Sequence, residues 1–215
     1  MPDCGMSTLT SAAQLATAGG TLILAVATYQ SVRSANRAAR VAEQSIAMRL
    51  QPVLVPSRPE DPPERVTFQE GIIVEAAGGT AAVEERNGIF YVVIPLRNVG
   101  PGLAVLRAGH VHLGRREIHD APPSPDSYRQ LNRDLYVPPG DRGYWQIGIR
   151  EESDPFWEPV ATAIRERELL TVTLLYTDNM GGHRAKTQFV VSPIDEIGWH
   201  VAVVRNWGIA DRDEL

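Results

Sequence analysis

The sequence predicts a mainly β protein in which a long N-terminal helix precedes an antiparallel β-sandwich with one short connector helix. Two observations support this fold class. No charged side chain lies between Asp3 and Arg33, and neither glycine nor proline interrupts residues 30–50. After Pro52, short apolar runs of strand length alternate with Gly/Pro-rich turns, which is the pattern of an antiparallel sandwich. The chain is therefore expected to divide into four segments, residues 1–32, 33–50, 51–207 and 208–215.

The stretch 9–32 is long enough to cross roughly 30 Å of hydrocarbon as a helix, and we expect it to be a retained transmembrane helix. Two alternatives stay open. One is a signal peptide cleaved after Ala25-Val26-Ala27, and the other is a buried helix of a soluble protein, because threonines and Gly19-Gly20 make the stretch only moderately apolar. A signal peptide needs a positively charged start, and no lysine or arginine precedes this stretch. The flanking charges therefore favour the retained helix.

The same charges predict the orientation of the helix. The side chains expected to meet the bilayer or its surface are Leu15, Leu22, Ile23, Leu24, Val26, Tyr29, Arg33 and Arg37. Because arginines follow the apolar stretch and none precedes it, the positive-inside rule places the N-terminus outside and the C-terminal domain in the cytoplasm. The arginines also suit anionic lipid head groups. We expect a single-pass protein of the cell membrane.

Residues 33–50 are expected to form an amphipathic juxtamembrane helix that ends before Pro52. Its apolar seam has the 3-4 spacing of one helix face and consists of Val32, Ala35, Ala39, Ala42 and Ile46. The seam either pairs with a second copy, which would make a homo-oligomer through the N-terminal helix, or lies against the protein's own domain or the membrane surface.

Composition excludes two classes of partner and structure. The chain carries a formal net charge of −5, and its basic residues form no Lys/Arg stripe after residue 50, which argues against nucleic acid as the main partner. Cys4 is the only cysteine, so no intramolecular disulfide can form. Lys186 is the only lysine, and such a preference for arginine is typical of a GC-rich bacterial genome.

The segment after Pro52 contains the expected strands. They are runs bounded by turn residues, at 52–56, 66–75, 89–97, 103–113, 143–150, 169–177, 186–192 and 199–204. A helix over 157–168 is expected to begin with a cap at Ser153-Asp154 and with Pro155 in its first turn.

Two turns carry a resemblance to a known family. Asn98, Gly100, Gly102 and Ala104 form an N-x-G-x-G-x-A turn, and a Pro139-Gly140-Asp141 turn follows later in the chain. This pairing resembles bacterial immunoglobulin-like sandwiches of the CARDB type. The resemblance implies an immunoglobulin-like fold and an adhesive or interaction role.

A third turn carries a second resemblance. The Tyr-x-Asp-x-x-Gly pattern at Tyr176, Asp178 and Gly181 is similar to one in a group of bacterial single-pass proteins, in which a spacer joins an N-terminal helix to a small β-domain. This second resemblance implies an architecture and no chemistry.

Few side chains suggest chemistry. His110 and His112 alternate on an expected strand, so both rings point to one face, as in some metal sites. A third ligand would have to come from His119, Asp120 or His183, and none stands at a diagnostic spacing. Two histidines on a half-exposed strand are more often ordinary surface residues, so we expect no bound metal and no cofactor.

The turn after residue 176 offers an alternative site, because Asp178 and His183 would flank one another as an acid–base pair. A turn-forming aspartate beside a solvent-facing histidine explains the same residues more simply. No nucleophile elbow, Walker loop, HExxH or paired CxxC occurs, so we expect no enzyme. Trp207, near the C-terminus, is a candidate for contact with a partner.

Three functions follow from these patterns. The first is a membrane-tethered, non-enzymatic interaction or scaffold module that binds a protein. The second is a sensor or enzyme domain that holds a small ligand or metal with His110 and His112. The third is an exported β-sandwich released by signal-peptide cleavage.

Overall fold

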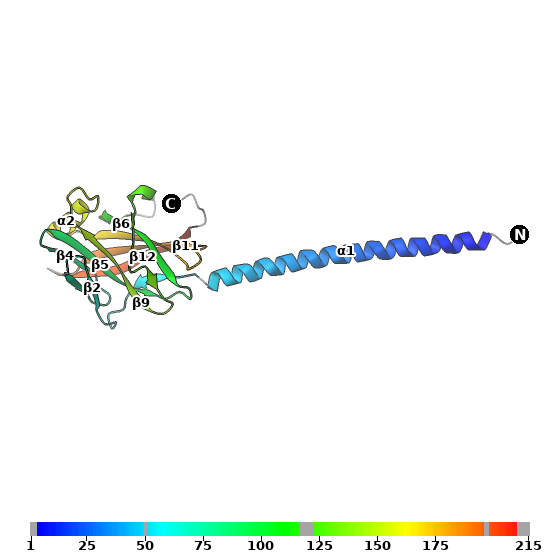
Figure 1. Ribbon diagram of the computed structural model, residues 1–215, viewed down its shortest axis with the longest axis horizontal. Helices are drawn as coiled ribbons and strands as arrows, with labels where there is room; N and C mark the ends of the chain where they lie inside the picture. Colours follow the sequence, from blue (N-terminus) through cyan, green and yellow to red (C-terminus); the bar gives the residue numbers. More distant parts are fainter. Residues whose placement is uncertain (1–3, 50, 117–122, 196–197, 210–215) are drawn as a thin grey trace. The chain divides into compact units, whose positions relative to one another are not determined.

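The computed structural model describes residues 4–49, 51–116, 123–195 and 198–209 and is mainly β (Figure 1). The helices are α1 (Cys4–Arg49), the 3-10 helix η1 (Pro125–Ser127) and α2 (Trp157–Glu166). The strands are β1 (Leu54–Pro56), β2 (Glu64–Thr67), β3 (Ile73–Ala76), β4 (Ala82–Arg86), β5 (Ile89–Asn98), β6 (Ala104–Leu113), β7 (Arg129–Gln130), β8 (Tyr136–Val137), β9 (Arg142–Ile149), β10 (Leu170–Thr177), β11 (Arg184–Pro193) and β12 (Trp199–Ile209). The chain divides into two compact units, residues 1–48 and 49–215.

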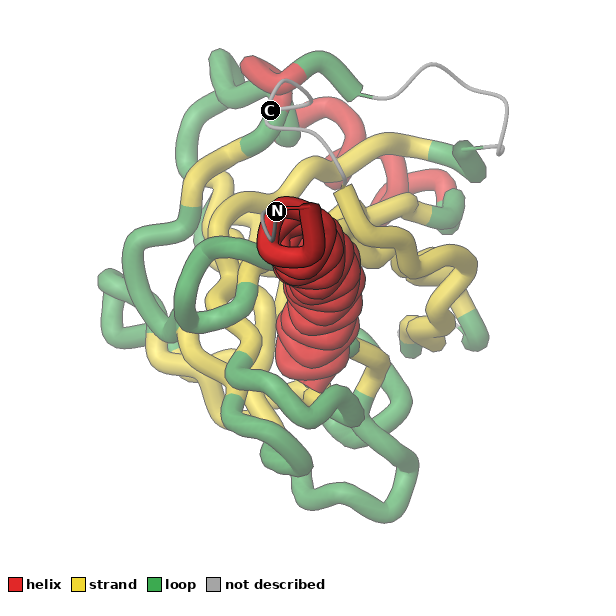
Figure 2. Tube along the Cα trace, turned by 90° about the vertical axis from the view of Figure 1, so that its right-hand side faces the viewer, coloured by secondary structure: helices red, strands yellow, loops and turns green. Residues whose placement is uncertain are grey.

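Helix α1 is one uninterrupted helix, which Figure 2 shows end-on. The described side chains of this helix, at residues 19–22 and 24–42, are all exposed. The stretch 9–32, predicted to span a membrane, lies within α1. Among the residues that the structure describes, no helix is both long and apolar enough to cross a bilayer. The side chains of Leu15 and Ile23 lie outside the described residues.

The β-domain contains a four-stranded antiparallel sheet centred on β5. Strand β9 pairs with one edge of β5 along its whole length, and β4 and β1 share the other edge. The short hairpin of β2 and β3 covers the outer side of this sheet. Phe68 in its turn lies edge-on to Tyr91 of β5, with ring centroids 4.5 Å apart. Tyr91 and Val93 are buried beneath the hairpin in a small second core, so β5 is buried on both faces.

The second sheet is six-stranded and antiparallel, with the order β12-β11-β10-β6-β7 and with β8 also paired to β6. Strand β10 lies at its centre, and every one of its residues is buried. Two β-bulges interrupt the regular pairing, one between β6 and β10 and one between β11 and β12.

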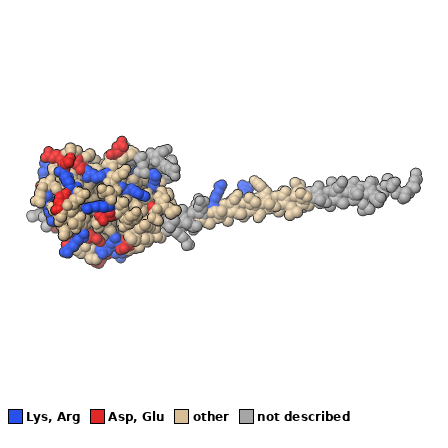
Figure 3. All heavy atoms as spheres, in the orientation of Figure 1, with Lys and Arg blue, Asp and Glu red and all other residues tan. Residues whose placement is uncertain are grey.

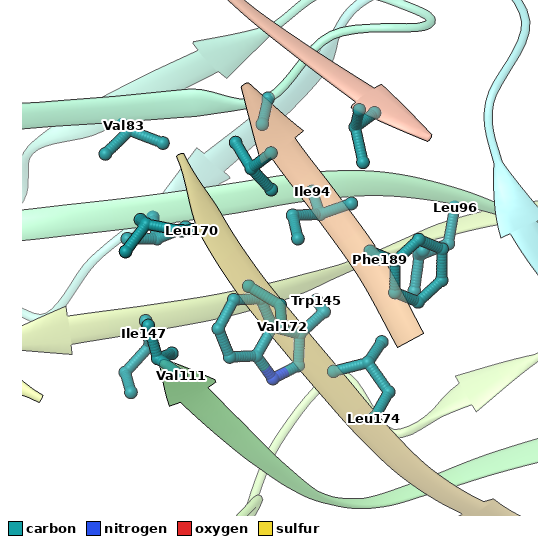
Figure 4. Packing of buried hydrophobic residues seen from close by; sticks show 14 of the residues in the cluster. Val83, Ile94, Leu96, Val111, Trp145, Ile147, Leu170, Val172, Leu174 and Phe189 are labelled. Atoms are coloured by element: carbon teal, nitrogen blue, oxygen red, sulfur yellow. The ribbon is translucent and has the colours of Figure 1, made fainter. Parts of the chain in front are cut away.

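One hydrophobic core draws on one face of each sheet and on α2. Figure 4 shows Trp145 of β9 beside Val172 of β10, and Ile147 of β9 beside Val111 of β6, in this core. Trp145 lies directly on the backbone of β6, because a Cβ atom at Gly109 would stand 2.6 Å from the indole Nε1. The absence of a side chain at Gly109 therefore sets how closely the indole approaches the second sheet.

Asn98, at the end of β5, joins three parts of the β-domain and is fully buried. Its Oδ1 accepts hydrogen bonds from the backbone N–H groups of Val53 (3.2 Å) and Gly100 (3.0 Å). Its Nδ2 donates to the carbonyl oxygens of Gly102 (2.7 Å) and Val137 (3.0 Å). The backbone of Asn98 also bonds to Gly140 and Asp141. The two turns that carried the family resemblance are therefore joined through this one residue.

The structure corrects several predicted boundaries. The run 66–75 is not one strand but the hairpin of β2 and β3, which turns at Gly71 with a φ of 74°. Strand β4 was not predicted, and β12 extends to Ile209, into the expected C-terminal tail. Helix α2 begins at Trp157, and the side chain of its N-cap residue, Phe156, forms no capping hydrogen bond. Instead, the Asp154 carboxylate accepts a hydrogen bond from the Phe156 N–H at 2.9 Å.

Replacement of Asn98 by alanine is expected to lower the free energy of unfolding by about 3 kcal/mol. The substitution leaves one buried and one part-buried N–H group and two buried carbonyl oxygens without their partner, and such groups keep a desolvation cost when unpaired. Urea denaturation followed by circular dichroism measures the change. The exposed Asn132→Ala is the control and should shift stability by less than about 0.5 kcal/mol. Equal effects of the two substitutions would contradict the role given to Asn98.

Gly109→Ala is expected to destabilise the β-domain by about 1–3 kcal/mol, because the new methyl group overlaps the Trp145 indole and the core must shift. Denaturation followed by tryptophan fluorescence, to which Trp145 contributes, measures the change. Gly208→Ala in β12 serves as control, since the nearest atom to its Cβ, the Arg184 carbonyl oxygen, would lie at 3.9 Å. A stability of Gly109→Ala equal to that of the unsubstituted protein would show that the indole does not need this close approach.

Candidate functional site

The candidate site lies on the face of the six-stranded sheet that points away from the main core, which we call the outer face. Residues directly opposite one another on antiparallel strands point to the same side of a sheet. One such row crosses the outer face through Trp207, Lys186, Leu175, Ala108 and Gln130. A second row contains Arg205, Gln188, Thr173 and His110. Polar and charged side chains therefore make up most of these two rows of the outer face.

Despite this composition, the centre of the outer face is buried. Thr173, Leu175 and Lys186 expose only 3%, 4% and 4% of their surface. The Lys186 ammonium lies 5.6 Å from the ring centroid of Tyr128, which belongs to the segment 123–135 between β6 and β9. Burying a charged side chain is costly unless it is paired, and the tyrosine ring face supplies one favourable contact.

A pocket of about 560 Å³ opens on the outer face. Its floor comes from β6, β10 and the start of β11, and one wall comes from segment 123–135. The apolar lining is Leu106, Ala108, Leu131, Leu135 and Leu175. The polar lining includes Arg107, Asp126, Tyr128, Gln130, Thr177 and Arg184. This volume lies within the range of small-molecule sites, and so does the combination of apolar walls with a few polar groups.

Arg107 reaches the pocket because it is the extra residue of the β-bulge in β6. Leu106 pairs with Tyr176 and Ala108 pairs with Leu175, so no residue of β10 stands opposite Arg107. Its Nε donates a hydrogen bond to the Thr177 hydroxyl at 3.2 Å. A bulge of this kind re-aims a side chain, and here it turns the guanidinium group over the outer face.

Hydrogen bonds hold segment 123–135 against β6, and an ion pair holds it against the residues just before α2. Its backbone bonds to β6 through Leu131 N–H to the Arg107 carbonyl (2.8 Å) and Leu106 N–H to the Leu135 carbonyl (2.7 Å). Arg129 forms an ion pair with Asp154 just before α2, and its guanidinium carbon lies 4.8 Å from the ring centroid of Phe156. The wall is therefore tied to both the sheet and the start of α2.

His110 and His112 lie on the outer face opposite Thr173 and Thr171, as the strand pattern predicted. His110 is half-buried beside the Tyr128 and Phe156 rings, at centroid distances of 5.6 and 5.9 Å, whereas His112 is exposed. Burial, followed by the nearby positive charges of Arg116 and His112, lowers the pKa of His110 from 6.5 to about 4. His110 is therefore neutral at pH 7.

Nothing completes a metal site around these histidines within the described residues, where no three His, Cys, Asp or Glu side chains gather. Two of the three candidates for a third ligand, His119 and Asp120, lie outside the described residues, and the third, His183, follows the turn between β10 and β11. The His110 Nδ1 and the Tyr128 hydroxyl are both buried and have no hydrogen-bond partner among the described residues. Burial also raises the pKa of the Tyr128 hydroxyl.

Asp178 has a structural position in the turn between β10 and β11. Its carboxylate accepts hydrogen bonds from the backbone N–H groups of Gly182 (2.9 Å) and His183 (3.1 Å), and the side chain is 4% exposed. Both carboxylate oxygens are thus bonded to turn backbone. This arrangement matches the turn-forming role that the sequence offered as the simpler interpretation.

Trp207 lies on the outer face at the sheet's edge and is half-buried, with the Arg205 guanidinium carbon 4.7 Å from its ring centroid. Arg33 and Arg37 are exposed on α1, and Figure 3 shows basic but no acidic side chains on the described part of this helix. The role of Trp207 as a partner contact stays a prediction.

Sequence reasoning missed the two pocket arginines. Arg107 stood within an expected strand, and Arg184 stood at the edge of an expected hairpin. The one available signal was weak: the inward positions of β6 change from even to odd numbers between Leu106 and Gly109, which indicates a bulge.

Comparison with known proteins finds no relative for this chain, since no family model, curated protein or solved structure matches it.

The pKa of His110 predicts how its substitution changes the pH dependence of stability. Between pH 6.5 and about pH 4, the unfolded chain binds a proton at this residue that the folded chain does not bind. The free energy of unfolding should therefore fall as the pH decreases through this window, by an amount on the order of 1–2 kcal/mol after allowance for partial exposure. His110→Gln should reduce this fall, as measured by urea denaturation at several pH values.

The exposed His112→Gln is the control and should leave the pH dependence close to that of the unsubstituted protein. If His110→Gln keeps the full loss of stability between pH 6.5 and pH 4, the histidine is not held neutral by burial.

Proposed function

We propose that this protein is a membrane-tethered, non-enzymatic interaction module. In this proposal α1 inserts in a lipid bilayer, and the β-domain is an immunoglobulin-like sandwich that binds a protein partner. The observation that carries the proposal is the row of exposed apolar side chains on a helix segment without charge. These side chains are Leu22, Leu24, Val26, Tyr29 and Val32, and each exposes 50% or more of its surface.

The distribution of these side chains favours lipid over a single partner helix. Leu22, Val26 and Tyr29 follow the spacing of one helix face, but Leu24 points to a different side. A helix that is apolar on several sides is typical of a membrane span, whereas a coiled coil needs one narrow seam. The Thr28 hydroxyl donates to the Leu24 carbonyl at 2.7 Å, so this polar group would enter lipid already paired.

Charge supports the proposed orientation. Arg33, Arg37 and Arg40 follow the apolar segment and are exposed, while no lysine or arginine precedes it. The positive-inside rule then places the β-domain in the cytoplasm, where the arginines meet anionic head groups. Homo-oligomerisation through the seam from Val32 to Ile46 is compatible with this arrangement and is a further part of the proposal.

The immunoglobulin-like character of the β-domain is supported by two features. Two antiparallel sheets share one core, which is the architecture of a sandwich. The Asn98 turn and the Pro139-Gly140-Asp141 turn, which together resemble CARDB-type modules, are hydrogen-bonded to each other. Modules of that type serve adhesion or interaction, and we transfer this role to the β-domain as a proposal.

Flotation with liposomes that contain anionic lipid tests the tether. The full chain should float with the vesicles and stay bound at high salt. Leu22→Arg combined with Leu24→Arg should reduce the floated fraction at least tenfold, since an arginine at the centre of a span costs about 2.5–3.5 kcal/mol. Val41→Arg, a matched change in the juxtamembrane part, should leave it unchanged. If the unsubstituted chain stays out of the vesicle fraction, the tether is wrong.

Labelling of Cys4 tests the orientation, because it is the only cysteine of the chain. A membrane-impermeant maleimide added to intact bacterial cells should modify Cys4 of the retained, N-out protein. The intact mass of the purified protein separates this outcome from export, because cleavage after Ala27 would remove the N-terminal residues and the cysteine with them. Labelling only after cell lysis would reverse the proposed orientation.

A further inference from the structure

Two arginines, Arg107 and Arg184, line the pocket on the outer face. Within the described part of the chain, neither Arg107 nor Arg184 takes part in an ion pair, whereas other arginines of the β-domain, such as Arg97 and Arg129, do. Arg107 has one hydrogen bond, from Nε to Thr177, and it leaves both terminal nitrogens of the guanidinium group without a bond to described residues. A guanidinium group whose terminal nitrogens form no other bond can still bind an anion.

Thr177 brings the two arginines to the same end of the pocket. Arg184 is the direct partner of Thr177 across the β10–β11 pair, where side chains stand about 5 Å apart at Cβ. Arg107 bonds to the Thr177 hydroxyl from the other side, through β6. Thr177 is therefore next to both arginines: it pairs with Arg184, and its hydroxyl accepts a hydrogen bond from Arg107. Asp126 also lines the pocket, so the charged lining has a net charge of +1.

Apolar side chains form another part of the pocket lining. Ala108 and Leu175 are paired residues that form part of the floor, and Leu131 and Leu135 of segment 123–135 form part of the wall. A volume of about 560 Å³ is much larger than a bare phosphate or acetate ion needs. The lining therefore suits a molecule with one anionic group and an apolar body.

We propose that this pocket binds a small organic anion, with its carboxylate or phosphate group held between Arg107 and Arg184 and its apolar body against Ala108, Leu135 and Leu175. Arginine favours such groups because its planar fork can donate two parallel hydrogen bonds to them. The site belongs to the β-domain alone and does not depend on α1 or on the membrane. The proposal goes beyond the tethered interaction module, because it assigns a ligand to the β-domain.

Isothermal titration of the full chain with four related probes tests the charge requirement. The probes are benzoate, phenyl phosphate, benzyl alcohol and benzylamine. The two anions should bind saturably, and the better of the two identifies the preferred head group. The neutral alcohol should bind at least tenfold more weakly, and the cationic amine should not bind. Equal binding of the alcohol and the anions would overturn the proposal, and so would the absence of saturable binding of both anions at 10 mM, roughly the weakest affinity that a fragment site shows.

Substitutions of the two arginines test the position of the site. Arg107→Gln and Arg184→Gln should each weaken binding of the better anion about tenfold, and the double variant should weaken it further, since hydrogen bonds between charged groups are the strong ones. Arg58→Gln is the matched control, because Arg58 is exposed, lies outside the pocket and forms no ion pair among the described residues. Unchanged affinity in Arg107→Gln and Arg184→Gln would place the anion elsewhere.

Ala108→Leu tests the apolar part while both arginines stay in place. The larger side chain fills the floor of the pocket, so affinity for benzoate or phenyl phosphate should fall at least tenfold. Inorganic phosphate, which has no apolar body, should compete with the better anion equally weakly in the unsubstituted and substituted proteins. Circular dichroism confirms that each variant is folded, and the single variants decide the question if the double variant is not. Full affinity in Ala108→Leu would remove the pocket as the binding site.

Discussion

The β-domain depends on the burial of a single amide side chain. Asn98 accepts two hydrogen bonds from the chain that enters β1 and from its own turn, and it donates two to the turn and to β8. Its four partners are backbone N–H and carbonyl groups, and buried backbone groups without partners are rare in native proteins. β1 and β5 belong to the four-stranded sheet and β8 belongs to the six-stranded sheet, so this side chain ties the two sheets at one end.

The two sheets differ in the side chains that they bury on the face pointing away from the main core. The hairpin of β2 and β3 covers the four-stranded sheet with apolar side chains, which needs no special pairing. The six-stranded sheet instead buries Thr171, Thr173, Lys186 and Gln188 on its outer face. Polar groups that are removed from water need partners, so the outer face restricts what can lie on it. The pocket occupies the part of this face where two cations keep unused hydrogen-bonding capacity.

The sequence predicted the fold class better than the site. Strands β9 and β10 were recognisable because apolar residues alternate along them, and the two glycine turns were recognisable because their residue types are tied to backbone geometry. Strand β4 was missed because the stretch from Ala82 to Arg86 is short and largely polar. The pocket was missed because it depends on a bulge and on segment 123–135 folding back over β6. The periodicity of β6 gives only a weak signal of the bulge and none of the position of this segment.

Because of the bulge in β6, Arg107 lines the pocket without changing which residues of β6 point into the core. Without Arg107, the residues on either side of it would alternate between core and outer face as in a regular strand, from Ala104 and Leu106 to Gly109 and Val111. Arg107 is thus an insertion in structural terms, added between two correctly paired halves of the strand. Evolution can gain, lose or exchange a residue at such a position without moving the core. Chains with different residues at this position would then keep the same antiparallel framework and core and differ in the lining of the pocket.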